Sequence, residues 1–255
     1  MFKNIFFFMT LILFTSVSAN ELKWLSLEEA VKMAERDNKT ILIDFYTDWC
    51  GWGKKMDKET YSDKGIIKIL NANFVVVKIN PEKQGTVKFK SGEMSYRELA
   101  NEVGVRGYPA TVFFTPDFKF IELVSGYFDP ENMKTVLNFM EEKKYNSISF
   151  QDYRLFTEVK KLSTAQKDNP KYDFILGYFH LTFFNEYEKA HARFQEALNK
   201  DLKSKELYAA LSLSTPNNSE STNKWLEQAK KLGYKDKSEI DDLVVTYVRE
   251  IFAKN

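Results

Sequence analysis

The first half of the chain contains two different patterns of apolar and polar residues, one typical of strands and one typical of helices. Two short runs rich in β-branched and aromatic residues, 40–46 and 74–79, have the length and composition typical of buried strands. Between them, residues 51–70 carry apolar positions at helical spacing, with a break near Asp63. A strand, a helix and a strand in this order predict a parallel pair in an α/β sheet.

Further helix and strand signals flank this unit. A capping box that begins at Ser26 predicts a helix ending near Asn38. The remaining elements expected in this half are a surface loop over 82–93, a short helix over 96–103, two antiparallel strands over 111–114 and 118–124, and a helix over about 130–144.

The second half of the chain has a purely helical pattern. Beyond Tyr145, glycine is scarce and no strand signal recurs. The helical segments expected here are 150–163, 171–184, 187–200, 204–213, 220–232 and 238–253. We therefore predict an α/β domain over 20–145 and an all-helical domain over 146–255.

Small residues in the helical half resemble the tetratricopeptide repeat. Gly177 and then Ala190, Phe194 and Ala197 occupy positions where that repeat lets two helices approach closely. The spacing from Gly177 to Ala190 is one residue longer than the repeat favours. A short tetratricopeptide-like array and a plain helical bundle both fit the pattern.

Composition and charge exclude several classes of protein. Hydrophobic residues make up 44% and charged residues 29% of the 255 residues, which excludes wholesale disorder and collagen-like or coiled-coil chains. Lys and Arg number 37 against 36 Asp and Glu. This balance does not favour binding to nucleic acid or to an anionic membrane surface.

The first 19 residues have the form of a secretory signal peptide. Lys3 precedes an apolar run over 5–14, and small residues at 17–19 predict cleavage after Ala19. The run is shorter than a spanning helix needs, and no later segment is apolar enough to span. We expect a soluble protein in the periplasm or another exported space.

Cysteine usage sharpens the question of function. Exported proteins often carry paired cysteines, but Cys50 is the only cysteine of the chain, so an internal disulfide is impossible. A single thiol in an exported protein is a buried inert residue, a site of intermolecular pairing, or a reactive group.

The residues around Cys50 resemble the active-site segment of thioredoxin-fold proteins. The sequence over 44–56 is Asp-Phe-Tyr-Thr-Asp-Trp-Cys-Gly-Trp-Gly-Lys-Lys-Met. It is closest to the exported branch with a Trp-Cys-x-Trp-Cys-Lys-x-Met motif, which includes the thioredoxin domain of the bacterial thiol:disulfide interchange protein. The resemblance covers residues 22–145 and implies a thioredoxin-like central sheet flanked by helices. At the family's second cysteine this chain has Gly53.

Elementary chemistry supports a reactive Cys50. A thiol at the start of a helix meets free backbone N–H groups and the positive end of the helix dipole, which favour the thiolate. Trp49 and Trp52 flank the sulfur; we expect one to pack beneath the loop and the other to be exposed, as suits a shallow peptide-binding surface. The alternative is a small buried hydrophobe, and we favour reactivity.

Four further residues are assigned roles by the resemblance. Residues 105–111 resemble the family's cis-proline loop, which implies that Pro109 packs beside the thiol and leaves the Tyr108 backbone free for an extended substrate; base rates alone favour a trans proline. Asp44 matches the family's buried acid, with Lys78 on the next strand. In the family this acid serves the second cysteine, so we interpret Asp44 as a relic; proton transfer to Cys50 through water is the alternative.

Two hypotheses of function follow. In the first, Cys50 is the nucleophile of a monothiol exchange protein with oxidoreductase or isomerase-like activity; Trp49, Trp52, Gly53 and Tyr108 form the substrate surface. Its partners are protein substrates, redox proteins or a small thiol, held as mixed disulfides. In the second, the chain is a non-catalytic binding module or scaffold. Neither needs a cofactor, and His180 and His191, eleven positions apart, match no metal spacing.

Overall fold

The computed structural model describes residues 21–89, 92–215 and 218–253. The predicted signal sequence, 1–19, lies outside these residues. Internal contacts divide the chain into two compact units, and the boundary along the chain lies between Lys134 and Thr135. The domain boundary expected between residues 145 and 146 stays a prediction. Within the described part, no helix is long and apolar enough to cross a membrane.

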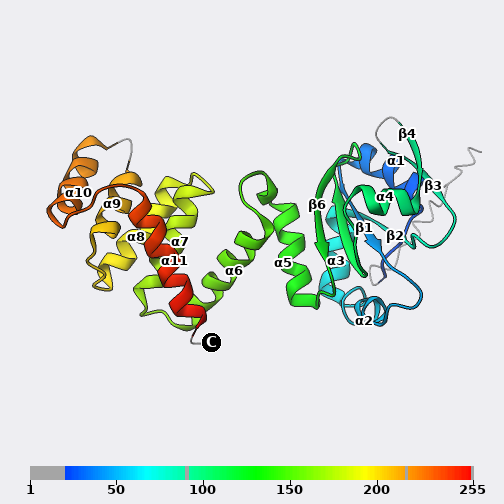
Figure 1. Cartoon of the computed structure of the whole chain (residues 1–255), viewed down its shortest axis with the longest axis horizontal. Coiled ribbons are helices and arrows are strands. Elements are labelled where there is room, and N and C mark those ends of the chain that lie inside the picture. Colours follow the sequence, from blue (N-terminus) through cyan, green and yellow to red (C-terminus); the bar gives the residue numbers. More distant parts are fainter. Residues whose placement is uncertain (1–20, 90–91, 216–217, 254–255) are drawn as a thin grey trace, which may run out of the picture. The chain divides into compact units, whose positions relative to one another are not determined.

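A four-stranded sheet with the order β2-β1-β5-β6 forms the centre of the first unit (Figure 1). Strand β1 (Thr40–Phe45) pairs in parallel with β2 (Phe74–Ile79) and antiparallel with β5 (Ala110–Phe114). Strand β6 (Phe120–Ser125) pairs antiparallel with β5. The parallel β1–β2 pair and the antiparallel β5–β6 pair agree with the sequence prediction, which did not include the β1–β5 pair. The mixed sheet is that of the thioredoxin-like fold.

Helices cover both faces of this sheet. Helices α1 (Leu27–Asp37) and α4 (Tyr96–Glu102) bury their apolar sides against one face, where alternate strand positions such as Ile43 and Val77 form the core. The intervening positions point to the opposite face. Helix α3 (Lys64–Asn73) contacts β2, and α2 (Gly51–Glu59) precedes it. The predicted break between these helices is confirmed, since Asp63 is the N-cap of α3.

The surface loop predicted over 82–93 is wrong in part. Strands β3 (Thr86–Phe89) and β4 (Gly92–Ser95) form a separate two-stranded antiparallel sheet. A Cβ atom at Gly85 would stand 2.2 Å from the Tyr96 ring, so the ring packs directly on the glycine backbone. None of the described side chains of this hairpin is fully buried, although Val87 and Met94 pack against the core. Each strand has only four residues, so the alternation of Thr86, Val87 and Lys88 is at the lower limit of the length that marks a strand.

The second unit is helical, as predicted. Helix α5 (Pro130–Glu141) runs across the division between the units and is followed by a 3-10 turn, η1 (Lys144–Asn146). The remaining helices are α6 (Phe150–Ala165), α7 (Pro170–Thr182), α8 (Tyr187–Asn199), α9 (Lys205–Leu213), α10 (Ser219–Lys231) and α11 (Ser238–Phe252).

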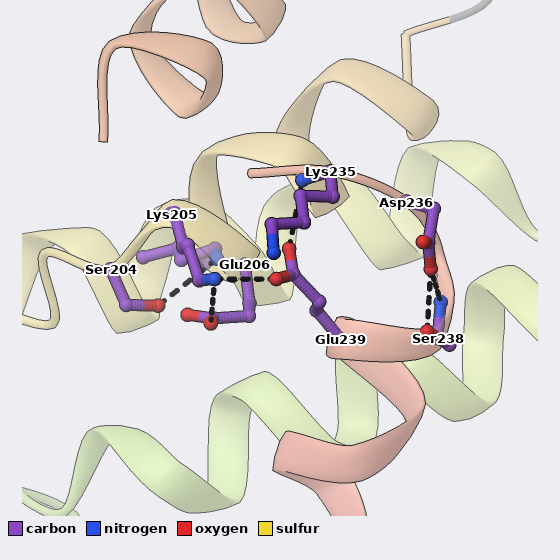
Figure 2. A network of polar contacts seen from close by, with 8 residues as sticks. Ser204, Lys205, Glu206, Lys235, Asp236, Ser238 and Glu239 are labelled. Carbon is purple, nitrogen blue, oxygen red and sulfur yellow. Dashed lines mark hydrogen bonds and ion pairs between the residues drawn. The ribbon is translucent and has the colours of Figure 1, made fainter. Parts of the chain in front are cut away.

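These helices pack as two neighbouring pairs, α7 with α8 and α9 with α10, and α11 contacts both α7 and α9 (Figure 1). Polar contacts hold the start of α11 against α9, as Figure 2 shows. The Lys205 ammonium lies 2.6 Å from one oxygen of Glu239, and the Lys235 backbone N–H donates to the other oxygen at 2.9 Å. This pairing joins the two helices through side chains that remain partly solvent-accessible.

Helices α7 and α8 approach each other closely at Gly177. A Cβ atom at this position would stand 2.5 Å from the ring of Phe194, which is fully buried. Ala190 and Ala197 on α8 are also fully buried. The small residues thus let two helices approach, which is the property that suggested a repeat; the tetratricopeptide-like arrangement itself stays a prediction.

We expect Gly177→Ala to destabilise the protein by about 1–3 kcal/mol, because the added methyl group overlaps a buried ring that has no room to move. In an open helix the same change is stabilising by up to about 1 kcal/mol. Denaturant unfolding measures the difference. Phe194→Leu in the Gly177→Ala background should recover part of the loss, and a stabilised Gly177→Ala single variant would contradict the close approach.

Candidate functional site

Cys50 stands at the junction of the central strand and a helix. The chain leaves β1 at Phe45, turns, and begins α2 with Cys50 as its N-cap residue. The Cys50 backbone N–H donates to the Thr47 carbonyl at 3.2 Å, and its carbonyl accepts from Lys54 at 3.2 Å. The predicted position at the start of a helix is confirmed, although the Cys50 side chain makes no capping hydrogen bond.

The cis-proline loop meets the sulfur of Cys50. The Tyr108–Pro109 peptide bond is cis, as the resemblance implied. The Cys50 thiol donates to the Tyr108 carbonyl over 3.3 Å. Cys50 is only 6% exposed, so its sulfur lies just below the protein surface, in contact with this loop. The arrangement brings together the two segments, near residues 50 and 109, that the sequence predicted to meet.

Gly53 leaves space for a side chain. A Cβ atom at this position would stand 3.8 Å from Cys50 Cβ and 3.9 Å from Cys50 Sγ, which is ordinary van der Waals contact. Gly53 also has a helical backbone that any residue adopts. Packing therefore does not require glycine here. A side chain at position 53 would lie next to the sulfur of Cys50.

Both tryptophans beside Cys50 are exposed. Trp49 is 67% exposed and Trp52 is 58% exposed, so the expectation that one of them packs beneath the loop is wrong. Trp49 is held at the surface by its indole N–H, which donates to the Glu82 carboxylate at 3.1 Å, and by an edge-to-face contact with the Tyr108 ring. A polar partner at the surface explains why its ring stays outside the core.

Asp44 lies on β1 and is paired in register with Lys78 of β2. It is 2% exposed, and one of its oxygens lies 3.5 Å from the Lys78 ammonium. Its other oxygen, Oδ1, is buried without a hydrogen-bond partner among the described residues. Burial raises the pKa of Asp44 to about 7, and the opposing attraction of Lys78 is too weak to restore the ordinary value.

Exposed Asp57 and buried Tyr61 lie next to this ion pair, and sequence reasoning missed both. Asp57, on α2, forms an ion pair with Lys78 and so competes with Asp44 for its charge. The Lys78 ammonium also lies 5.9 Å from the centre of the Tyr61 ring, and burial raises the pKa of Tyr61. Cys50, Gly53 and Asp57 are spaced three and four residues apart on one helix, a signal that could have placed Asp57 near the site.

The two histidines have structural partners in the helical unit. His180 bonds through Nδ1 to Glu186 at 2.6 Å, and His191 bonds through Nδ1 to Ser214 at 3.0 Å. Burial lowers the pKa of each. Across the described residues, no group of three or more His, Cys, Asp or Glu side chains could hold a metal ion.

Comparison with known proteins agrees with the fold. A family model described as "Thioredoxin-like domain" matches residues 27–141. Together with the sheet order and the cis proline beside Cys50, this match shows that the first half of the chain is a thioredoxin-like domain.

Individual relatives match the same region. The thiol:disulfide interchange protein DsbD of Photorhabdus laumondii is 31% identical over 108 residues, which are 42% of this chain and 17% of that protein. An uncharacterized protein of Caenorhabditis elegans is 31% identical over 114 residues, 44% of this chain and 15% of its own length. The chain thus spans less than a fifth of either relative.

Among solved structures, a putative disulphide-isomerase from Bacteroides thetaiotaomicron is 30% identical. The match has a TM-score of 0.39 and covers 48% of this chain and 95% of that one.

Replacing Asp44 by Asn should stabilise the protein at pH 8 and leave it nearly unchanged near pH 4. The folded-state pKa of about 7 lies above the ordinary 3.8, so the stability of the unmodified chain is full below about pH 4 and falls as the pH rises towards 7. Denaturant unfolding should show a gain above about 1 kcal/mol at pH 8. An equal gain in the free energy of unfolding at both pH values would show that ionisation of Asp44 does not destabilise the folded protein. Asp48→Asn, which removes an exposed acid, is the matched control.

Proposed function

We propose that the chain carries out thiol-disulfide exchange with polypeptide or small-thiol partners through Cys50 alone. The observation that carries this proposal is the contact between Cys50 Sγ and the Tyr108 carbonyl, which sets the thiol beside a cis proline and between two exposed indoles. The kinship with a thiol:disulfide interchange protein supports the same class of chemistry.

The exchange needs two successive attacks. Cys50, as thiolate, attacks one sulfur of a partner disulfide; that S–S bond breaks, a mixed disulfide forms, and the other partner sulfur leaves as a thiolate that takes up a proton. A second thiolate then attacks the partner sulfur of the mixed disulfide and releases Cys50. Because Gly53 offers no thiol, the second thiolate belongs to the partner, to a redox protein or to a small thiol.

In this proposal Trp49, Trp52 and Tyr108 form the surface on which the partner lies, and Pro109 holds the Tyr108 carbonyl against the sulfur. Asp44 and Lys78, paired on the neighbouring strands β1 and β2, contribute charge to the electrostatic field at the site. The chain makes no net oxidation or reduction in a single encounter, because each exchange returns Cys50 to its starting state. This behaviour is isomerase-like.

We also propose that the protein works in an exported compartment. The pattern of residues 1–19 supports this, since it combines a positive start, an apolar run and small residues before Asn20. An oxidising compartment supplies the disulfides on which the exchange depends.

The direct test is capture of a peptide disulfide. Incubation with a symmetrical cysteine-peptide disulfide should yield a mixed disulfide on Cys50, seen as one added peptide mass that disappears on reduction. Cys50→Ser should add none. If the unmodified chain adds no peptide, the exchange proposal fails. If a partner protein binds Cys50→Ser as tightly as the unmodified chain, the exchange proposal is replaced by the alternative of a non-catalytic binding module. The exposed indoles of Trp49 and Trp52 would also serve such a module.

Gly53→Cys tests whether the rest of the site is competent. The space beside Cys50 accepts a side chain, so the variant should form an internal disulfide and gain reduction of insulin with dithiothreitol as electron donor. Gly53→Ser, which has nearly the same volume and no thiol, is the matched control and should gain nothing. Equal activity of the two variants would show that residue 53 acts through packing rather than through its sulfur.

A further inference from the structure

A second aromatic pair lies beside Cys50, on a segment that sequence reasoning left without a role. The Trp52 ring, on the first turn of α2, lies 5.5 Å from the Tyr127 ring with the planes tilted by 40°. Trp52 remains 58% exposed. The pair therefore presents aromatic surface to solvent, and Trp52 is two residues along the chain from Cys50.

The backbone holds Tyr127 in place from two sides. Just before it, the Gly126 N–H donates to the Pro109 carbonyl at 2.9 Å, which ties this segment to the cis-proline loop. Just after it, the Phe128 carbonyl accepts from the Thr60 hydroxyl at 2.6 Å, which ties the segment to the end of α2. Tyr127 is thus fixed relative to both parts of the site, which lowers the entropic cost of using its ring for binding.

Charged groups at this pair compensate one another. The Lys55 ammonium lies 5.2 Å from the centre of the Trp52 ring and 4.8 Å from that of Tyr127. Glu59 lies 3.8 Å from Lys55 and accepts a hydrogen bond from the Tyr127 hydroxyl at 2.6 Å, which raises the pKa of Tyr127. Glu59 thus balances the Lys55 charge beside the two rings, and the exposed part of the Trp52 ring supplies the apolar surface of the pair.

We propose that Trp52 and Tyr127 form a subsite for a large apolar or aromatic side chain that lies next to the cysteine of an extended polypeptide partner. This inference rests on the proposed exchange at Cys50 and names the partner chemistry that the site prefers. The occupant is a side chain next to the partner's cysteine in the same segment. The mixed disulfide holds that cysteine at Cys50, which is two residues along the chain from Trp52. Tyr127 is a specificity-determining residue, and Lys55 and Glu59 position the two rings.

The test compares rates of mixed-disulfide formation, followed by intact mass, for three peptides of equal length. Each peptide carries its cysteine as a disulfide with mercaptoethanol, and the residues flanking the cysteine are Phe, Ala or Glu. The unmodified chain should react about fivefold to tenfold faster with the Phe peptide than with the Ala peptide, which is the size of one aromatic contact. Tyr127→Ala should reduce this ratio to below about twofold.

An unfolded variant would also lose the preference, so denaturant unfolding must show that Tyr127→Ala is folded under the conditions of the assay. Tyr127→Phe keeps the ring and removes the Glu59 hydrogen bond, so it should retain the preference. The inference is overturned if the unmodified chain shows no preference for Phe, if Tyr127→Ala keeps it, or if the Glu peptide reacts fastest, since Lys55 would then be selecting an acid. Failure of the underlying exchange is a separate outcome, in which no peptide and no hydroxyethyl disulfide reacts.

Discussion

The antiparallel register between β1 and β5 is the constraint on which the site depends. Phe45, the last residue of β1, pairs with Ala110, the first residue of β5. The segment that follows β1 and the segment that precedes β5 must therefore leave the sheet at the same end. Cys50 lies in one and Pro109 in the other, so a shift of register would separate the sulfur from the Tyr108 carbonyl and place apolar side chains on the wrong face.

Strand register also explains why Asp44 is buried. Side chains alternate along β1, so the residue between Ile43 and Phe45 points to the face opposite their core cluster, and it pairs with Lys78 on one side and Thr111 on the other. The acid keeps one oxygen without a hydrogen bond and a pKa near 7. A group that is this costly to ionise is a local conflict with stable folding, and such conflicts are characteristic of functional sites.

The sequence predicted the fold well wherever burial imposes a period. The central strands, the helices of the second unit and the meeting of Cys50 with Pro109 followed from apolar runs, capping residues and motif resemblance. The β3–β4 hairpin did not, because its strands have only four residues each and none of their described side chains is fully buried. Tyr127 and Asp57 were missed because their roles depend on contacts across the fold, to Trp52 and to Lys78. The exposure of Trp49 depends on Glu82, 33 residues away.

The position of β1 and β5 in the sheet determines how the site responds to partial unfolding. They are the two inner strands of four, and each has a neighbour on both sides. Fraying at β2 or β6 can therefore occur while the inner pair stays joined, since edge elements open at lower free energy than the centre of a sheet. Local fluctuations at the edges therefore leave joined the two strands that lead to Cys50 and to the cis-proline loop.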